Sequence, residues 1–371
     1  MKIVIDLRSL QNGNFSGVEN FIFNITQELL ALDKKNSYVL FYNSYNNFKF
    51  PEFNFLNAKN VYTKIPNKIL NILFKFHIIS LEKLVGDFDI LFMPNLNLIN
   101  KKNTKKLIVT VHDLSFVRLP EFYDIKRRFW HWFLNPRRLL TLADKIVTVS
   151  NYSKNDIIDK FNIPTSKIEV VYPGVDTHVL TTHSEPNQLR QVRNFYGLPK
   201  RFFLFLNTIE PRKNVINVVK AFEQFVGEEY LVIAGKLGWR TRNTLKQIKQ
   251  SNKKNKIIYL GYVKESFKPA LIKLSTAVLY PSFYEGFGFQ VLEANALNVP
   301  AIASQVTSLP EIAPQANLLV NPQNIRDILL AMQVIANQPF KNSELNSEIA
   351  HQFSWKTSAE KKLKNLEAIC V

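Results

Sequence analysis

The sequence has a single cysteine and no long apolar run, and both features narrow the class of protein. Cys370 has no partner in the chain, which excludes an internal disulfide framework and is typical of a reducing compartment. No apolar stretch approaches the ~20 residues that a membrane-spanning helix needs. The N-terminus, MKIVIDL, enters a strand pattern without the apolar core and cleavage site of a signal peptide, so we expect a cytoplasmic protein.

Several chemical motifs are also missing. There is no GxGxxG, so a nicotinamide-dependent enzyme is unsupported. No DxD motif follows a predicted strand, and the histidines and the cysteine form no cluster with metal-ligand spacing. We therefore expect no cofactor and no metal requirement.

The chain carries a large positive charge. It has 371 residues, a net charge of +18 and 46% hydrophobic residues, which together indicate a packed protein of two domains. Both halves share the charge, and residues 101–150 are the most basic window, with 11 Lys or Arg and 4 Asp or Glu. An anionic membrane surface, an anionic glycan or a basic surface with no dedicated partner would each account for it. No nucleic-acid module accompanies the charge, so we expect no nucleic acid as partner.

Apolar runs alternate with helical patterns in both halves, as in mostly parallel sheets flanked by helices. Five runs in the first half predict strands: Lys2–Asp6, Tyr38–Tyr42, Ile90–Met93, Leu107–Val111 and Lys145–Val149. Five in the second half do the same: Phe202–Leu206, Tyr230–Ala234, Ile257–Leu260, Ala277–Tyr280 and Ala301–Ala303. The polar stretch 173–200 loses periodicity, and we expect the domain linker there. The predicted fold class is α/β, with two doubly wound, Rossmann-like domains.

The most informative stretch is Ser282–Pro300, SFYEGFGFQVLEANALNVP. It follows a predicted strand and places Glu285 and Glu293 eight positions apart, around Gly286 and Gly288 and at the start of a predicted helix. Free backbone N–H groups and the positive end of the helix dipole favour phosphate at such a junction. Carboxylates accept hydrogen bonds from hydroxyls, so the predicted ligand is a sugar phosphate.

This stretch resembles the donor-binding motif of retaining glycosyltransferases with the two-domain GT-B fold. Further landmarks of that family follow in its order, among them SGVENF, VHDLSF, VTVSNYSKNDI, VVYPGVD, NTIEPRKN and LVIAGKLGW. The resemblance implies an acceptor-side domain over residues 1–190 and a donor-binding domain over residues 191–355. It also implies that a last helix, within residues 356–371, packs back on the first domain.

The resemblance assigns roles to individual residues. Lys213 and Arg212 match cations that bind the diphosphate, Glu285 matches a contact to the sugar hydroxyls, and Glu293 matches a bidentate contact to the ribose. His112 corresponds to a histidine close to the donor sugar. The remaining donor-binding candidates lie in loops at strand ends and in an N-terminal loop: Gly17, Asn207, Gly235, Gly286, Phe287, Gly288 and Phe289. Because Arg212, Lys213 and the helix dipole supply positive charge, transfer without a metal is expected.

The implied activity is retaining transfer of a hexose from a nucleotide diphosphate sugar to a glycan or lipid-linked glycan hydroxyl. Overall likeness to mannosyltransferases of surface-polysaccharide and lipopolysaccharide assembly favours GDP-mannose, and UDP- and dTDP-sugars stay open. One alternative is a sugar-nucleotide epimerase or hydrolase on the same fold. Another is a non-catalytic glycan- or phosphate-binding protein.

Two amphipathic stretches raise the possibility of a peripheral membrane protein. Residues 126–133, KRRFWHWF, interleave cations with aromatic rings, and Ile65–Val85 carries apolar residues at helical spacing. Rings at headgroup depth and cations at lipid phosphates favour an anionic bilayer interface. The alternative is that both stretches pack into the first domain.

Overall fold

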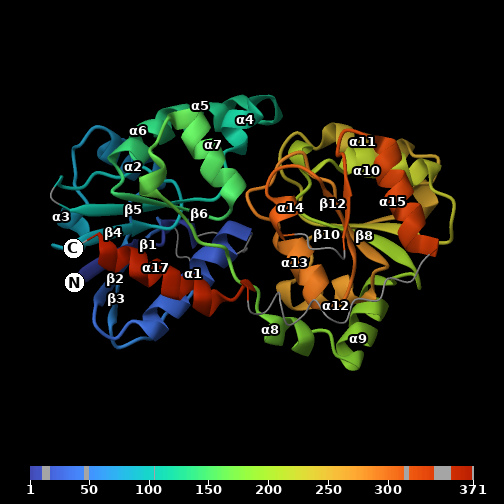
Figure 1. Cartoon of the computed structure of the whole chain (residues 1–371), viewed down its shortest axis with the longest axis horizontal. Helices are drawn as coiled ribbons and strands as arrows, with labels where there is room; N and C mark the ends of the chain where they lie inside the picture. The colour runs from blue at the N-terminus through green and yellow to red at the C-terminus, as the bar shows by residue number, and fades with distance from the viewer. Residues whose placement is uncertain (11–16, 46–49, 104, 313–316, 338–351, 370–371) are drawn as a thin grey trace. The chain divides into compact units, whose positions relative to one another are not determined.

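A computed structural model describes residues 1–10, 17–45, 50–103, 105–312, 317–337 and 352–369 (Figure 1). Cys370 lies outside these residues. The chain forms two compact units: unit 1 comprises Met1–Leu114, Lys126–Gly174 and Trp355–Val371, and unit 2 comprises Ser115–Ile125 and Val175–Ser354. The segment Ser115–Ile125 thus leaves unit 1 and belongs to unit 2, although unit 1 surrounds it in the sequence.

Unit 1 contains a seven-stranded sheet in the order β3-β2-β1-β4-β5-β6-β7, with all neighbours parallel. Its strands are β1 (Lys2–Asp6), β2 (Ser37–Asn43), β3 (Ala58–Thr63), β4 (Ile90–Met93), β5 (Lys106–Val111), β6 (Lys145–Thr148) and β7 (Ile168–Val170). The central strands are continuous apolar runs because both faces of a parallel sheet are covered. Strand order reverses between β1 and β4, which defines the switch point of a doubly wound sheet.

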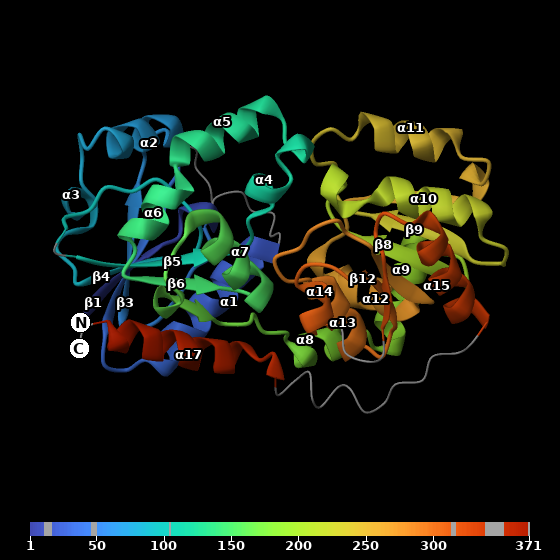
Figure 2. The same ribbon diagram turned by 45° about the horizontal axis from the view of Figure 1, so that its top comes forward.

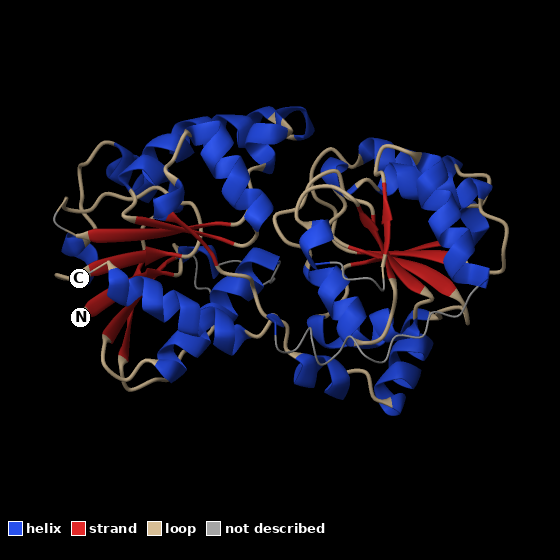
Figure 3. Ribbon diagram, in the orientation of Figure 1, coloured by secondary structure: helices blue, strands red, loops and turns tan. Residues whose placement is uncertain are grey.

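The helices of unit 1 cover both faces of this sheet (Figure 3). They are α1 (Gly17–Leu32), α2 (Asn67–Lys75), α3 (Glu82–Val85), α5 (Ile125–Leu134), α6 (Pro136–Leu142), α7 (Asn151–Phe161) and α17 (Trp355–Ala368). Figure 1 shows α1 and α17 on one face, and α2, α5, α6 and α7 on the other. The chain moves outward from β1 in both directions along the sheet. Because the connections between parallel strands are right-handed, the two directions place their helices on opposite faces.

The C-terminal helix α17 is part of unit 1 and packs against α1. Phe21 of α1 meets Trp355 edge-on, with ring centroids 5.9 Å apart. Lys362 of α17 is fully buried, with its Nζ 4.4 Å from the centre of the Phe92 ring and 3.2 Å from Thr110 Oγ1. Burial keeps the pKa of Lys362 well below its usual value. The helix therefore carries a polar group into the core as well as an apolar face.

Unit 2 contains a six-stranded parallel sheet in the order β10-β9-β8-β11-β12-β13. Its strands are β8 (Phe202–Leu206), β9 (Tyr230–Ala234), β10 (Ile257–Gly261), β11 (Ala277–Tyr280), β12 (Ala301–Ser304) and β13 (Leu318–Val320). The order reverses between β8 and β11, so the carboxyl ends of these two strands flank the switch point. Ligands of doubly wound sheets bind at such a point.

Helices again cover both faces of the sheet of unit 2. Its helices are α4 (Ser115–Arg118), α8 (Thr177–Thr182), α9 (Pro186–Tyr196), α10 (Val215–Gln224), α11 (Arg242–Gln250), α12 (Lys268–Leu274), α13 (Phe289–Ala296), α14 (Leu309–Ile312) and α15 (Ile325–Asn337). Helix α10 packs against α15 over a core rich in phenylalanine, and α12 packs against α9 and α13. Within the described part of the chain, no helix is both long and apolar enough to cross a membrane.

The predicted fold class is confirmed. The polar stretch 173–200, where the domain linker is expected, contains the boundary between the two units at Gly174 and Val175, and it also contains the helices α8 and α9. Each helix buries only one side chain fully, Leu180 in α8 and Val192 in α9, so neither produces a strong apolar period. Asp176 caps α8 by accepting from the amide of Val179, and Gly197 ends α9 in the left-handed conformation.

Candidate functional site

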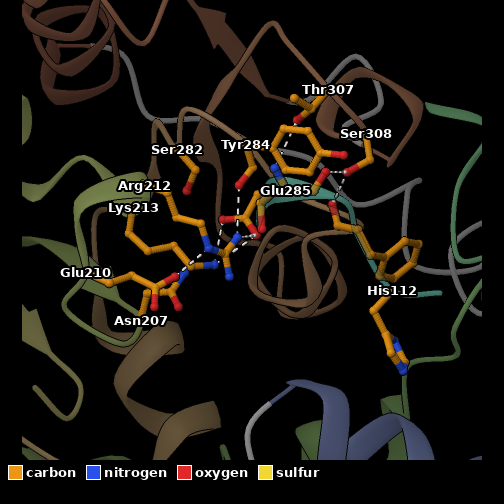
Figure 4. A network of polar contacts seen from close by, with 12 residues as sticks. His112, Asn207, Glu210, Arg212, Lys213, Ser282, Tyr284, Glu285, Thr307 and Ser308 are labelled. Carbon is orange, nitrogen blue, oxygen red and sulfur yellow. Dashed lines mark hydrogen bonds and ion pairs between the residues drawn. The ribbon is translucent and has the colours of Figure 1, made fainter. Parts of the chain in front are cut away.

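Loops at the carboxyl ends of β8, β9 and β11 bring most of the predicted site residues together in unit 2. The first leads from Asn207 to the short 3₁₀ helix Pro211–Lys213, the second begins at Gly235, and the third runs from Ser282 to Gly288. Figure 4 shows Lys213, Arg212 and Glu210 gathered around Glu285. Because parallel strands end at one edge of the sheet, residues some 70 positions apart in the chain become neighbours.

The centre of the network is a buried ion pair between Lys213 and Glu285. The ammonium of Lys213 lies 2.7 Å from Oε1 and 2.9 Å from Oε2 of Glu285. Both side chains are nearly inaccessible to solvent, with exposures of 7% and 6%. The ammonium also lies 5.5 Å from the centre of the Tyr280 ring. A buried charge pair of this kind needs close geometry and further hydrogen bonds to offset its desolvation.

Arg212 links that pair to a second carboxylate. Its Nε lies 2.5 Å from Oε1 of Glu210, and its Nη1 lies 3.3 Å from Oε2 of Glu285. Nη1 also donates to the backbone carbonyl of Tyr284, at 3.0 Å. Two cations and two carboxylates therefore balance in charge, and the guanidinium spans the gap between the β8 and β11 loops.

The pKa values follow from this arrangement. Burial opposes ionisation of Glu285, but Lys213 and Arg212 outweigh it, so the pKa of that carboxyl lies below its usual value. Burial, assisted by the neighbouring Arg212, lowers the pKa of Lys213 against the opposing effect of the two glutamates. Glu285 is thus held as a carboxylate that can accept hydrogen bonds from hydroxyls.

Two residues to which we had assigned no role hold the Glu285 loop in place. Ser308 Oγ donates to the carbonyls of Glu285 and Phe287, at 3.0 and 2.7 Å, and Thr307 Oγ1 accepts from the Glu285 amide at 3.2 Å. Thr307 has φ +64°, which is rare for a β-branched residue and indicates local strain.

Gly288 connects this loop to helix α13. It stands at the helix N-cap with φ +130°, and an added Cβ would lie 2.5 Å from Leu309 and 2.8 Å from Ile312. Only glycine fits at this junction. Phe287 is buried, its ring 5.3 Å from that of the half-buried Phe289, and Gly286 is buried as well. The predicted strand, glycine loop and helix start are therefore all present.

The β8 and β9 loops are bonded to one another. The Asn207 amide donates to Ala234, the Ile209 amide to Lys236 and the Gly238 amide to Ile209, each at 2.9 Å. Gly235 has φ +142°, and an added Cβ would lie 1.8 Å from the carbonyl oxygen of Asn207. These contacts fix the backbone that leads to Arg212 and Lys213, and they place both Asn207 and Gly235 at the predicted edge.

Glu293 lies one turn into α13 and is half-buried. Among the described residues, no hydrogen bond or ion pair joins its carboxylate to the network around Glu285. Burial raises the pKa of Glu293, with a further contribution from Glu265, while Lys268 acts against it. The carboxyl is therefore easier to protonate than an exposed glutamate.

His112 belongs to unit 1, where it follows β5. Its Nε2 lies 2.8 Å from the carbonyl oxygen of Pro94, and its ring meets Phe21 edge-on at 4.8 Å. Burial lowers its pKa despite the carbonyl contact. Since a carbonyl only accepts, Nε2 carries the hydrogen of the neutral ring, and Nδ1 is left as an acceptor.

Gly17 is exposed and begins helix α1, and residues 11–16, which precede it in the predicted N-terminal loop, lie outside the described residues. Asn214 precedes α10 with φ +65°, but its side chain does not cap that helix. Its amide instead donates to the carbonyls of Pro281 and Pro322, at 2.8 and 2.7 Å. Asn298 also adopts the left-handed conformation, with φ +57°.

Over the part of the chain that the structure describes, no cluster of three or more His, Cys, Asp or Glu side chains could hold a metal ion. Arg212 and Lys213 are basic side chains at the sheet edge, and both are candidates to bind a phosphate there.

Comparison with known proteins supports the resemblance. Residues 15–179 match the family described as Glycosyltransferase Family 4, and residues 190–352 match Glycosyl transferases group 1. The chain is 30% identical over 260 residues to O-antigen chain mannosyltransferase B of Escherichia coli, covering 68% of this chain and 67% of the relative. It is 26% identical to the serotype-specific mannosyltransferase WbdA of Escherichia coli, covering 68% of this chain but only 32% of that longer protein.

The fold is similar to that of solved glycosyltransferase structures. Sucrose-phosphate synthase from Thermosynechococcus elongatus superposes with a TM-score of 0.77 at 16% identity, covering 99% of this chain and 98% of that one. The two family matches together cover most of the chain, and with this fold they establish the family. The chain belongs to the glycosyltransferases of the family 4 and group 1 type.

Proposed function

We propose that the protein transfers mannose from GDP-mannose to a hydroxyl of a glycan or lipid-linked glycan, with retention of configuration and without a metal. The choice of mannose rests on the mannosyltransferases among its relatives. The observation that carries the proposal is the buried network of Lys213, Arg212 and Glu285 at the switch point of unit 2. It offers cations for a diphosphate beside a carboxylate for sugar hydroxyls.

The chemistry follows from charge. When the bond between the sugar C1 and the diphosphate oxygen breaks, negative charge grows on that oxygen, and the cations stabilise it more in the transition state than in the ground state. The acceptor oxygen bonds to C1 on the same face, and its proton passes to the departing diphosphate. An ammonium has three N–H donors, so Lys213 can bind a phosphate oxygen while it stays paired with Glu285.

The test is a donor and acceptor panel with the intact protein. We expect GDP to be released from GDP-mannose when a mannose-terminated glycan acceptor is present, in buffer with EDTA, and the new linkage to keep the anomeric configuration by NMR. Equal release without acceptor would indicate a hydrolase. No release from any nucleotide sugar, with binding intact, would indicate a non-catalytic binding protein.

The pH dependence of nucleotide binding provides a second measurement. If ionised Glu293 accepts from the ribose hydroxyls, GDP affinity will fall as the pH drops towards the raised pKa of that carboxyl, which lies above its ordinary 4.5. Calorimetric titration from pH 8 to pH 5 should show this loss, and Glu293→Gln should bind weakly throughout with a flatter profile. Because GDP itself titrates, the pH profile of GDP affinity is compared between the parent and Glu293→Gln. Identical profiles would contradict the assignment of Glu293 to the ribose.

We also propose that unit 1 docks on an anionic membrane surface through α2 and α5. The helices lie side by side in both ribbon views (Figures 1 and 2), and Lys75 of α2 donates to the carbonyl of Phe133 in α5, at 2.5 Å. Four apolar side chains on these helices and that of Phe76, directly after α2, are 47–73% exposed; the four are Ile69, Ile72, Phe129 and Trp132.

The charges of these two helices favour an anionic bilayer over a neutral one. Lys68 and residues 126–128 are exposed cations, and neither helix contains an aspartate or glutamate. Exposed rings with surrounding cations and no acids are complementary to a bilayer with anionic headgroups, whereas a neutral bilayer would not use the cations. Such a surface suits an enzyme whose acceptor is linked to lipid.

Vesicle sedimentation tests this docking. We expect binding to vesicles that contain anionic lipid to exceed binding to neutral ones at least tenfold, and to weaken as salt is added. Trp132→Ala should reduce it, whereas Leu330→Ala, an exposed apolar residue of unit 2, should not. Equal weak binding to both kinds of vesicle would contradict the membrane docking and leave the transferase proposal intact.

A further inference from the structure

Buried serine hydroxyls from β12 and the turn after it hold the backbone of the loop that carries Glu285. Ser304 Oγ, at the end of β12, donates to the Ser282 carbonyl at 2.5 Å. Ser308 Oγ donates to the carbonyls of Glu285 and Phe287, at 3.0 and 2.7 Å. Both serines are fully buried. The hydroxyls therefore hold the loop at its start and near its end.

The first peptide group of this loop joins the β12 hydroxyls to the loop that carries the cations. A trans peptide directs its C=O and its N–H in opposite directions. The Ser282 carbonyl accepts from Ser304. The other end of that peptide group, the Phe283 amide, donates to the Arg212 carbonyl at 2.8 Å. One side of this peptide group thus faces β12, and the other faces Arg212.

The peptide group between Tyr284 and Glu285 has the same two neighbours with its ends exchanged. Its N–H, the Glu285 amide, donates to Thr307 Oγ1 at 3.2 Å. Its carbonyl, that of Tyr284, accepts from Arg212 Nη1 at 3.0 Å. In Figure 4 the hydroxyls and the cations accordingly lie on opposite sides of Glu285.

Ser308 fixes two further peptide groups of the loop. It holds the carbonyls of Glu285 and Phe287. The amides of the same two peptide groups, those of Gly286 and Gly288, therefore point away from Ser308. Within the described part of the chain, neither amide N–H has a hydrogen-bond partner. Both donors are thus directed to the side of the loop on which the cations lie.

We propose that Ser308 is a positioning residue for the diphosphate of the donor. By holding two carbonyls with one hydroxyl, it presents the amides of Gly286 and Gly288 to the phosphate oxygens beside the two cations. Hydrogen bonds from an amide to an anion are charge-assisted and stronger than neutral ones, so the direction of these donors affects binding. The inference rests on the proposed function, because the diphosphate is that of the proposed donor.

Calorimetric binding of three ligands to the intact protein tests it. We expect Ser308→Ala to weaken the binding of pyrophosphate and of GDP about tenfold or more, because hydrogen bonds to charged groups are worth that factor. The affinity for guanosine, which has no phosphate, should change less than about twofold, since it loses no such bond. A general disturbance of the site would weaken guanosine binding as well, so the comparison separates positioning of the phosphate donors from a structural role.

Ser275→Ala is the matched control. Ser275 Oγ donates to the Ile272 carbonyl at 2.7 Å, and Ser275 precedes β11, so it lies at the opposite edge of the sheet from the site. Its loss removes a bond of the same kind, and all three affinities should match those of the parent. Ser308→Cys, whose thiol is a weak donor, should lie between the parent and Ser308→Ala, and it takes the place of that variant if Ser308→Ala does not fold.

The outcomes separate the possible failures. If Ser308→Ala binds pyrophosphate and GDP as tightly as the parent, or loses guanosine to the same extent, the inference is overturned. If the parent transfers no mannose from GDP-mannose, yet its binding of GDP and pyrophosphate depends on Ser308, the proposed function fails and the inference stands. A parent protein that binds neither GDP nor pyrophosphate would contradict both.

Discussion

Replacing Lys213 with alanine is expected to lower kcat/KM for the nucleotide sugar by about 10³-fold, with a simultaneous loss of stability. The activity falls because the proposed reaction loses one of the two cations assigned to the departing diphosphate, and single preorganised groups of this kind contribute about 10²–10³ in rate. Stability falls because Glu285 becomes a buried carboxylate without its closest partner. Breaking a buried pair from one side costs about 3–5 kcal/mol.

The two effects of Lys213→Ala separate by their dependence on pH. In the parent, the pKa of Glu285 is lowered, so its ionisation contributes stability above the pKa of the unfolded chain, and this contribution is lost as the pH falls. In the variant, burial dominates and the folded-state pKa is raised, so the sign reverses. The deficit in melting temperature should therefore shrink between pH 7 and pH 5, while the activity does not return.

A double variant provides the matched control for charge. Lys213→Met with Glu285→Gln removes both charges and keeps the side-chain volumes, so we expect near-parent stability with no transfer. Lys246→Ala, an exposed lysine of α11, should change neither quantity. A Lys213→Ala protein that retains more than a tenth of the parent kcat/KM would show that the diphosphate is bound elsewhere.

The sheets were predictable because buried parallel strands are continuous apolar runs. Phe202–Leu206, Tyr230–Ala234 and Ala277–Tyr280 have the same bounds in the sequence analysis and in the structure. The strand Ala58–Thr63 was missed because it lies at the edge of its sheet, where polar residues are tolerated and the apolar run disappears.

The location of the site could be predicted from the sequence, but which cation pairs with which carboxylate could not. Strand ends placed Arg212, Lys213 and Glu285 at one edge, since the carboxyl ends of neighbouring parallel strands converge. Which carboxylate each cation contacts depends on side-chain directions across loops that are 72 or 73 residues apart. No periodicity or spacing in the sequence indicates that Glu210 pairs with Arg212.

At Gly235 the backbone of the β9 loop packs tightly against that of the β8 loop. Alanine there would place its Cβ 1.8 Å from the carbonyl oxygen of Asn207, at a φ of +142° that side chains rarely adopt. The backbone must move, and the movement is transmitted to the 3₁₀ helix that carries Arg212 and Lys213. We expect Gly235→Ala to lower the melting temperature and to reduce transfer more than 100-fold.

Gly261→Ala separates this clash from the cost of the backbone angle alone. Gly261 is the last residue of the neighbouring strand β10 and has φ +68°, and an added Cβ there has no heavy atom within 4 Å. Its substitution should cost about 1–2 kcal/mol of stability, the ordinary penalty of a left-handed residue, and leave transfer nearly unchanged. If Gly235→Ala proved as mild as Gly261→Ala, in both melting temperature and kcat/KM, the two loops would not be packed as described, and the cations would not depend on that packing for their position.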